Sequence, residues 1–262
     1  MSEAMNHAAK TLSGQITWVT GAGSGIGEAA AEALADAGAV VVLTGRRPEP
    51  LQHVAKRIAA LGGVAHVKPA DLTNAEAVTA VAAAIHDEFG RLDVLVNNAG
   101  LNIEHRRWSV LTPAGVDEVI GGNLRSVFYC VAAVLPMMRK QGGGLLIHTA
   151  SFAGRFISPL SGPAYTAAKH GVVAMSHSIN MEECVNNIRS CALCPGEVAT
   201  PILDKRPVPV SAEDRARMVQ PEDCARVIRF IAETPPHVCL NEILISPTHN
   251  RSYVAALARS GS

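Results

Sequence analysis

Apolar runs of strand length alternate with segments of helical periodicity along almost the whole chain of 262 residues. The strand-like runs are short and rich in β-branched residues, as in ITWVT at 16–20 and VVVLT at 40–44. Each is followed by a segment with helical spacing of its apolar residues, of which GEAAAEALADAG at 27–38 is the first. Because strands that alternate with helices pair in parallel, this pattern predicts an α/β fold with helices on both faces of one sheet.

The same pattern predicts seven strands in all. Further strands are expected at 64–68, 93–97, 145–150, 188–193 and 242–246, and further helices at 51–62, 75–90, about 115–139, about 164–186 and from Pro221. We see no linker or repeat, so residues 1–262 are expected to form one domain, with residues 1–11 as a flexible tail. The segments 101–112 and 201–221 interrupt the rhythm, and are either substrate-binding loops or surface decoration.

Composition and charge argue against several classes of function. The 23 basic and 23 acidic residues give no net charge, so we expect no nucleic-acid partner. The first fifteen residues lack the apolar core of a signal peptide, and no run of 18 apolar residues occurs, so we expect a cytoplasmic protein that does not span a membrane. Cys191 and Cys194 form a C-x-x-C, but in a strand they would point to opposite faces, which favours buried reduced thiols.

A glycine-rich stretch, TGAGSGIG at 20–27, joins the first predicted strand to the first predicted helix. Glycine is needed where the backbone turns tightly and where a pyrophosphate approaches main-chain N–H groups. The start of a helix adds unpaired N–H groups and the positive end of its dipole. The loop therefore predicts a dinucleotide site, although a flavin or S-adenosylmethionine site would use a similar loop.

The end of the second predicted strand indicates which dinucleotide is bound. Proteins that bind NAD place a carboxylate there, against the ribose hydroxyls. This chain has Gly45 at that point, followed by Arg46 and Arg47. A guanidinium can hold a 2′-phosphate through two hydrogen bonds. This favours NADP(H) as the cofactor, with NAD(H) as the alternative if the two arginines are only solvated.

Tyr165 and Lys169 lie one helical turn apart in SGPAYTAAKHG, in a chain with only three tyrosines. Residues four apart share a helix face. An ammonium about 4 Å from the phenol contributes about 4 kcal/mol at an effective dielectric of about 20, enough to lower the phenol pKa from about 10 to near 7. Such a phenol can exchange a proton with an alcohol near neutral pH.

Other polar residues fall where they could serve the same chemistry. Ser151 ends the fifth predicted strand and could hold a carbonyl oxygen. Asn123 lies inside an otherwise apolar predicted helix, where an amide needs a reason. NNAG at 97–100 and CPGEVAT at 194–200 end the fourth and sixth strands, at the sheet edge where α/β proteins bind ligands.

Taken in order, these motifs resemble those of the short-chain dehydrogenase/reductase family, from about Leu12 to Thr248. The resemblance implies a single-domain Rossmann fold with a doubly wound seven-stranded parallel sheet, and an NAD(P)-dependent oxidoreductase acting on CH–OH groups. It also implies a homotetramer or homodimer, with the helices around 123–139 and 165–183 at the subunit interface. The motifs that carry it are TGAGSGIG, Asp71 in ADLTN, NNAG, Asn123, Ser151, Tyr165-x-x-x-Lys169, and Pro195-Gly196 with Thr200.

The resemblance also implies roles for individual residues. Tyr165 would be the general acid and base, Ser151 would orient the substrate oxygen, and Asn123 would hold a water of the proton relay. Lys169 would bind the nicotinamide ribose and tune Tyr165. The remaining cofactor contacts would come from Gly21, Ser24, Gly25, Ile26, Arg46, Asp71, Leu72, Asn98, Ala99, Gly100, Pro195, Gly196, Val198 and Thr200.

The substrate is left open between two classes. The ending PPHVCLNEILISPTHNR resembles NADP-dependent 3-hydroxy acid dehydrogenases, and Arg106, Arg107 or Arg155 could hold a carboxylate. A general carbonyl reductase is the alternative. The histidines show no metal-ligand spacing, so we expect no catalytic metal. Two rivals of other kinds are a non-catalytic dinucleotide sensor and a methyltransferase.

Overall fold

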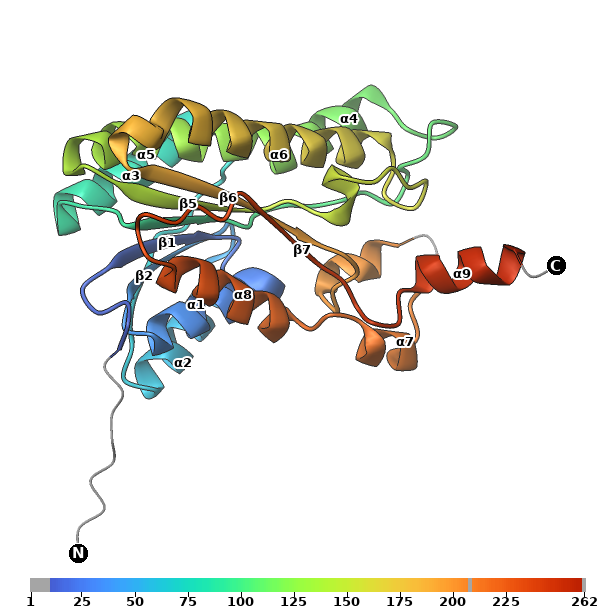
Figure 1. Cartoon of the computed structure of the whole chain (residues 1–262), viewed down its shortest axis with the longest axis horizontal. Coiled ribbons are helices and arrows are strands. Elements are labelled where there is room, and N and C mark those ends of the chain that lie inside the picture. Colours follow the sequence, from blue (N-terminus) through green and yellow to red (C-terminus); the bar gives the residue numbers. More distant parts are fainter. Residues whose placement is uncertain (1–9, 207–208, 261–262) are drawn as a thin grey trace, which may run out of the picture.

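One parallel sheet of seven strands forms the centre of the molecule (Figure 1). The computed structural model describes residues 10–206 and 209–260. The strand order is β3-β2-β1-β4-β5-β6-β7, and every pair is parallel. The predicted doubly wound sheet is therefore confirmed. The strands are β1 (Ile16–Thr20), β2 (Val40–Thr44), β3 (Val64–Val67), β4 (Val94–Asn97), β5 (Gly144–Thr149), β6 (Ile188–Pro195) and β7 (Glu242–Ile245).

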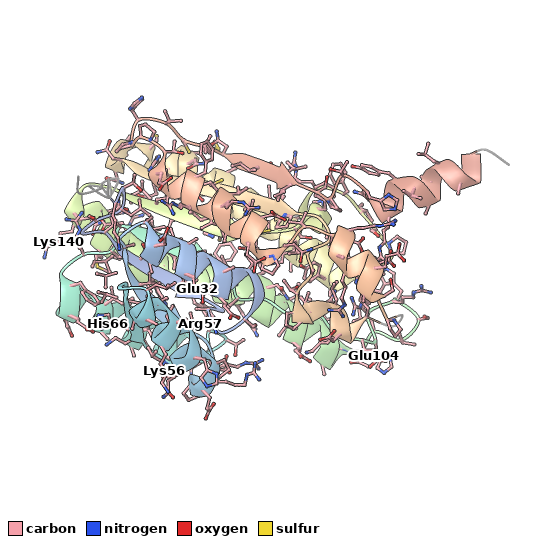
Figure 2. All side chains as sticks on the ribbon, turned by 90° about the horizontal axis from the view of Figure 1, so that it is seen from below. Glu32, Lys56, Arg57, His66, Glu104 and Lys140 are labelled. Atoms are coloured by element: carbon pink, nitrogen blue, oxygen red, sulfur yellow. The ribbon has the colours of Figure 1, made fainter. Side chains whose placement is uncertain are left out.

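Helices cover both faces of this sheet, with α1, α2 and α8 on one side and α3, α5 and α6 on the other (Figure 1). Alternate residues of a strand point to opposite faces, so Trp18 and Val19 enter different cores. Arg57 of α2 pairs with Glu28 and Glu32 of α1, which fastens two helices on the same face (Figure 2). These helices are α1 (Gly25–Asp36), α2 (Pro48–Ala60), α3 (Ala75–Phe89), α5 (Ser126–Gln141), α6 (Pro163–Glu183) and α8 (Pro221–Glu233).

The long helix expected at about 115–139 is interrupted by a π-helical turn. It consists of α4 (Pro113–Ile120), the π turn Gly121–Arg125 and α5. Together they make a continuous stretch, Pro113–Gln141, whose length and mean hydropathy of 1.4 would also suit a membrane span. Half of the most apolar 18 residues of this stretch are buried inside the molecule, as in a core helix. The expectation that nothing spans a membrane stays a prediction.

Helical structure also occurs in one of the two segments that interrupt the predicted pattern, and near the C-terminal end of the described residues. The segment 201–221 contains a short 3-10 helix, Pro201–Lys205, and α7 (Ala212–Arg217). Residues after Asn250 form α9 (Arg251–Ser260), which projects beyond the body of the molecule (Figure 1). Of the tail expected at 1–11, residues 1–9 lie outside the described residues. Thr11 is described, and its hydroxyl donates to Glu233 at 2.5 Å.

Candidate active site

Loops that follow β1, β4 and β6 meet at the carboxyl edge of the sheet. A Cβ atom on Gly21 would lie 2.9 Å from the Cα of Ala99, and one on Gly25 would lie 3.0 Å from the Cγ2 of Thr200. Both glycines also have positive φ, 63° and 58°, which other residues rarely adopt. The glycines of TGAGSGIG thus let the predicted phosphate loop pack directly against the NNAG motif and the segment after β6.

Thr20, which the sequence analysis did not single out, holds the first two of these loops together. Its hydroxyl accepts hydrogen bonds from the N–H groups of Asn98 (2.9 Å) and Ala99 (3.1 Å), and donates to the carbonyl of Val96 (3.2 Å). The signal was present in the sequence, because a hydroxyl at the end of a buried strand must find partners. Thr20 therefore fixes the NNAG backbone where a cofactor ribose is expected.

A cleft of about 480 Å³ opens between these loops and the end of β2. Gly45 and Arg46 line it where the sequence predicted the choice of dinucleotide. Hydrogen bonds from Thr73 and the nearby charge of Arg46 lower the pKa of Asp71, so its carboxylate is ionised. The glycine loop, the start of α1 and Arg46 fit a phosphate-bearing dinucleotide. The predicted contacts that line this cleft are Gly21, Ser24, Arg46, Asp71, Leu72, Ala99 and Gly100.

The other predicted cofactor contacts are not among the residues that line this cleft. Ile26 packs its side chain against the core. Pro195 ends β6, and the N–H of Gly196 donates to the carbonyl of Ile245 at 2.7 Å. The side chain of Val198 is buried among Val219 and Cys224. Thr200 lies against Gly25 of the glycine loop, and the cofactor-binding roles of all these residues stay predictions.

Lys169 and Tyr165 lie together on α6, as the spacing predicted. The Lys169 ammonium is 5.6 Å from the centre of the Tyr165 ring and donates to the carbonyl of Thr149 at 2.8 Å. A Cβ on Gly100 would lie 3.5 Å from that ammonium and 2.8 Å from the side-chain oxygen of Asn123. The end of β5, the segment after β4, the π turn and α6 therefore each bring a residue to the same place: Thr149, Gly100, Asn123 and Lys169.

The pKa of Tyr165 differs from the expectation. Burial raises the pKa of the phenol above its ordinary 10.0, and a hydrogen bond with Ser151 and the charge of Arg106 offset this only in part. Burial also lowers the pKa of Lys169 to about 8. The expected lowering by Lys169 was wrong for the protein alone, because its ammonium is turned to the Thr149 carbonyl and the phenol has lost water.

Asn123 and Ser151 are each held by backbone groups. The Asn123 amide donates to the carbonyls of Leu101 and Val119, both at 2.8 Å, and its oxygen accepts from the N–H of Leu101 at 3.1 Å. This explains why an amide lies inside a helix, at the π turn. The Ser151 hydroxyl accepts from the N–H of Ala153 at 3.1 Å. The relay water expected at Asn123 stays a prediction.

Strands β5 and β6 carry three buried side chains with titratable groups: His148, Cys191 and Cys194. Cys191 and Cys194 point into opposite cores, as predicted, and burial raises the pKa of each thiol to about 12. His148 is fully buried, and its Nδ1 lies 3.2 Å from the Asn97 amide. Its Nε2, however, has no hydrogen-bond partner among the described residues. Burial and the charge of Lys169 lower its pKa to about 3.

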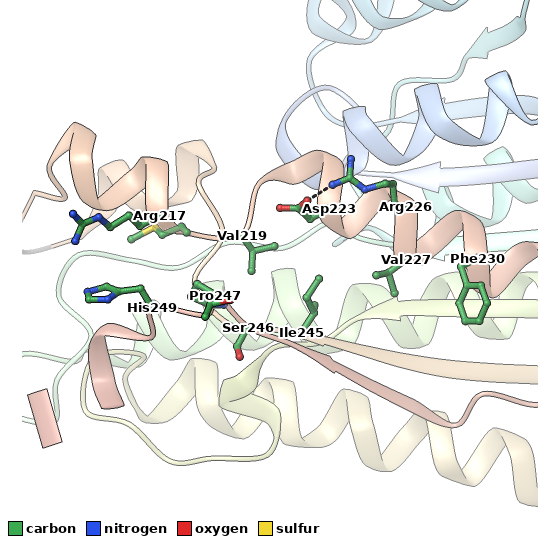
Figure 3. Close-up of a pocket in the computed structure, with 12 residues that line it drawn as sticks. Arg217, Val219, Asp223, Arg226, Val227, Phe230, Ile245, Ser246, Pro247 and His249 are labelled. Carbon is green, nitrogen blue, oxygen red and sulfur yellow. Dashed lines mark hydrogen bonds and ion pairs between the residues drawn. The ribbon is translucent and has the colours of Figure 1, made fainter. Parts of the chain in front are cut away.

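A second hollow, of about 660 Å³, lies away from this site between α8 and the segment after β7 (Figure 3). Val227, Phe230 and Pro247 give it an apolar wall, and Asp223 pairs with Arg226 at its edge. It shares none of the predicted site residues that the structure describes. In the same described ranges, no three His, Cys, Asp or Glu side chains gather in a group that could hold a metal.

Comparison with known sequences gives a consistent family assignment. Residues 15–208 match the family model described as short chain dehydrogenase. An uncharacterised oxidoreductase of Staphylococcus saprophyticus is 33% identical over 247 residues, which cover 89% of this chain and 96% of that protein. One from Staphylococcus aureus strain MW2 is 36% identical over 239 residues, covering 90% and 98%.

Solved structures with the same fold have been determined with nicotinamide dinucleotides. A metagenomic short-chain oxidoreductase in complex with NADP superposes with a TM-score of 0.80 and 33% identity, covering 92% of this chain and 100% of that one. An alcohol dehydrogenase from the archaeon Thermococcus sibiricus, complexed with 5-hydroxy-NADP, gives a TM-score of 0.82 and 27% identity, covering 90% and 98%.

Proposed function

This chain belongs to the short-chain dehydrogenase family and is an NAD(P)-dependent oxidoreductase, and on that basis we propose that it interconverts ketones and secondary alcohols with NADP(H), using Tyr165 as general acid and base. The observation that carries the proposal is the convergence of Tyr165, Lys169, Ser151 and Asn123 beside the glycine-loop cleft. When bound, the nicotinamide gives or takes the hydride. The protein has to supply the proton and the orientation.

Each side chain has a separate part in this reaction. The Ser151 hydroxyl, already within reach of the phenol, holds the substrate oxygen, and Tyr165 gives that oxygen its proton during reduction. In the direction of oxidation, Tyr165 takes the proton back. Burial keeps the phenol protonated at neutral pH in the protein alone, so the site is set as an acid before cofactor binds. Lys169, held by the Thr149 carbonyl at 5.6 Å from the centre of the Tyr165 ring, would bind the nicotinamide ribose.

The proposal is tested with Tyr165→Phe, compared with Tyr129→Phe on α5 as a matched control. NADPH oxidation is followed over a panel of ketones and aldehydes, and NADPH binding is measured by fluorescence. We expect Tyr165→Phe to lower kcat about 10²- to 10⁴-fold while NADPH binding is retained. We expect Tyr129→Phe to behave like the unmodified protein. Retention of turnover in Tyr165→Phe would remove the proposed role of the phenol.

Support for NADP(H) over NAD(H) comes from Arg46 and from the NADP complex of the metagenomic relative. Arg46 is exposed at the end of β2, where a guanidinium can reach a 2′-phosphate, and Gly45 offers no carboxylate to repel it. NAD(H) remains the alternative cofactor, and relative affinities for NADPH and NADH decide between them.

We also propose a homodimer or homotetramer that uses the outer faces of α5 and α6. Phe128 of α5 and Met181 of α6 are 49% and 81% exposed, which supports a contact there. Light scattering coupled to size-exclusion chromatography tests this, and a monomer at micromolar concentration would contradict it.

A further inference from the structure

Arg106 is an unusual buried side chain in the loop that follows β4. It is only 7% exposed, whereas arginine is almost never buried without a partner. Its stem packs on Gly162, where an added Cβ would lie 2.8 Å from the Arg106 Cβ and 3.1 Å from its Cγ. Gly162 directly precedes α6, three residues before Tyr165. The packing therefore holds this guanidinium beside the start of the helix that carries the proposed acid.

The guanidinium itself is only partly bonded. One terminal nitrogen donates to the carbonyl of Lys205. The Nε–H is buried and has no hydrogen-bond partner in the part of the chain that the structure describes. Among residues 10–206 and 209–260, no carboxylate forms an ion pair with Arg106. A buried cation that has no ion pair and no partner for one of its donors is costly, unless a bound anion supplies them.

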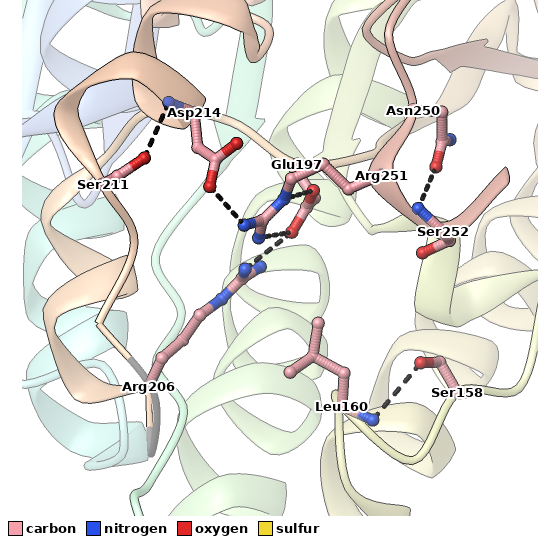
Figure 4. Close-up of polar contacts among 9 residues, drawn as sticks. All are labelled: Ser158, Leu160, Glu197, Arg206, Ser211, Asp214, Asn250, Arg251 and Ser252. Atoms are coloured by element: carbon pink, nitrogen blue, oxygen red, sulfur yellow. Dashed lines mark hydrogen bonds and ion pairs between the residues drawn. The ribbon is translucent and has the colours of Figure 1, made fainter. Parts of the chain in front are cut away.

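The charges around Arg106 indicate where an anion would bind. Burial and the nearby charge of Arg206 lower the pKa of Arg106, and the phenol of Tyr165 and the carboxylate of Glu104 counter this more weakly. The charge of Arg206 is already balanced, because Arg206 forms an ion pair with Glu197 at 2.6 Å (Figure 4). Glu197 also accepts from Arg251 at 2.8 Å. The unbalanced charge therefore lies with Arg106, close to Tyr165.

The other two arginines proposed from the sequence do not share these properties. Arg155 is paired with Glu242, with 3.0 Å between Nε and the carboxylate oxygen, and its side chain is 48% exposed. Arg107 follows Arg106 in the same loop but is exposed to solvent. Only for Arg106, among these three described residues, do burial, a free donor and proximity to Tyr165 coincide.

We propose that Arg106 binds a carboxylate of the substrate, so that the enzyme acts on short oxo acids and the corresponding hydroxy acids. This rests on the proposed function, and it assigns the substrate class of the same site. One unbalanced guanidinium matches a monoanion, and a planar carboxylate can take two of its N–H groups at once. Because Arg106 lies beside Tyr165, the carboxylate has to be within a few bonds of the reacting carbon.

The reaction leaves the carboxylate unchanged. In oxidation, the C–H bond of the hydroxy acid breaks, its hydride passes to NADP⁺ and its O–H proton passes to Tyr165. The products are the oxo acid, NADPH and one proton released to water. Reduction is the reverse, with the proton returned by Tyr165. The role of Arg106 is to bind and orient, which predicts an effect on acid substrates that their esters do not share.

The experiment compares each acid with its own neutral ester. NADPH oxidation is measured with 2-oxobutanoate, 3-oxobutanoate and 4-oxopentanoate, and with the methyl ester of each. We expect kcat/KM for at least one acid to exceed that for its ester about 10- to 100-fold, the range of a hydrogen-bonded charge pair. We expect Arg106→Met to bring this ratio close to one, mainly by raising KM for the acid, and Arg107→Met to leave it unchanged.

A conservative variant covers the case in which Arg106→Met does not fold, as judged by circular dichroism. Arg106→Lys keeps the charge but loses the planar fork, so part of the acid preference should remain. The inference would be overturned by an unchanged acid-to-ester ratio in Arg106→Met, or by a native enzyme that prefers the esters. Equal losses for acid and ester would overturn it too, because Arg106 would then act through Tyr165. In those cases the proposed function stands, whereas no turnover of any carbonyl compound would refute the proposed function itself.

Discussion

Replacing Gly27 with alanine tests whether the glycine loop is shaped by close backbone packing. A Cβ on this α1 residue would lie 2.3 Å from the carbonyl oxygen of Gly21 and 2.5 Å from the side-chain nitrogen of Asn98. The first atom belongs to the backbone, the second is held by hydrogen bonds to the carbonyls of Thr20 and Gly21, and an ordinary contact needs about 1 Å more. The added methyl group must therefore push the glycine loop away from α1.

The magnitude follows from two opposing effects. Overpacking of this kind costs about 1–3 kcal/mol, and contact with a backbone oxygen belongs at the upper end. Alanine regains about 1 kcal/mol as the better helix former. We therefore expect the free energy of unfolding of Gly27→Ala to fall by about 1–2 kcal/mol, which lowers Tm by about 3–6 °C in a domain of this size.

Cofactor affinity should fall more sharply than stability. A loop displaced by about 1 Å misaligns the N–H groups that would face the pyrophosphate, and a lost hydrogen bond to a charged group corresponds to roughly a 10- to 100-fold rise in the Kd for NADPH. Fluorescence titration measures the Kd, and urea unfolding measures the stability.

Gly144→Ala is the matched control, because its new Cβ would meet the side chain of Met138, with Sδ at 2.5 Å. Methionine can adjust its rotamers, so we expect a cost of about 1 kcal/mol or less and an unchanged Kd for NADPH. If Gly27→Ala binds NADPH as tightly as Gly144→Ala does, close packing under the glycine loop is not what shapes the cofactor site.

Three further predictions concern charge. Because burial raises the pKa of Tyr165, its phenol should ionise above pH 10.0 in the protein alone, and at lower pH with NADP⁺ bound. Ultraviolet difference spectra against Tyr165→Phe measure this ionisation, and ionisation below pH 10.0 without cofactor would contradict the prediction. Burial alone would raise the pKa of Glu197, but Arg251 and Arg206 lower it below its ordinary 4.5. The stability that this ion pairing contributes is therefore complete above pH 4.5, and it is lost as the pH falls through the lowered pKa of Glu197 in the folded protein. Arg251→Met should thus cost about 1–3 kcal/mol at neutral pH and less in acid, and an equal cost at both pH values in urea unfolding would refute the pairing. Arg46→Ser should raise the Kd for NADPH about 10-fold or more and leave that for NADH unchanged, and parallel losses for both would exclude a contact with the 2′-phosphate.

Much of the architecture could be predicted because it depends on local periodicity. Each of the seven strands lies within about two residues of its expected position, since an apolar β-branched run between polar turns has few alternatives. The helix boundaries were less accurate: α2 begins at Pro48 rather than Leu51, because proline at the first helical turn lacks only an N–H group that would be unpaired anyway. Helix α9 was not anticipated, and its residues 252–258 are exposed to solvent.

The site residues divide in a similar way. Tyr165, Lys169 and the glycine loop could be predicted as site residues from the sequence, because their spacing fixes a shared helix face or a turn. Thr20 was missed, because its importance depends on two N–H groups more than seventy residues away. The pKa of the phenol was predicted in the wrong direction, because the distance and orientation of the Lys169 ammonium are not set by a four-residue spacing alone.

The sequence by itself determined the order of strands and helices, the glycine-rich turn and the pairing of phenol with ammonium, because these depend on contacts within one or two turns of the chain. Only the tertiary structure decided which of three arginines lies buried beside Tyr165, since the loop after β4, the residue before α6 and the carbonyl of Lys205 come together only when the sheet is assembled. Burial and long-range electrostatics add over neighbours from distant segments, so the charge balance of the site follows from packing and not from spacing.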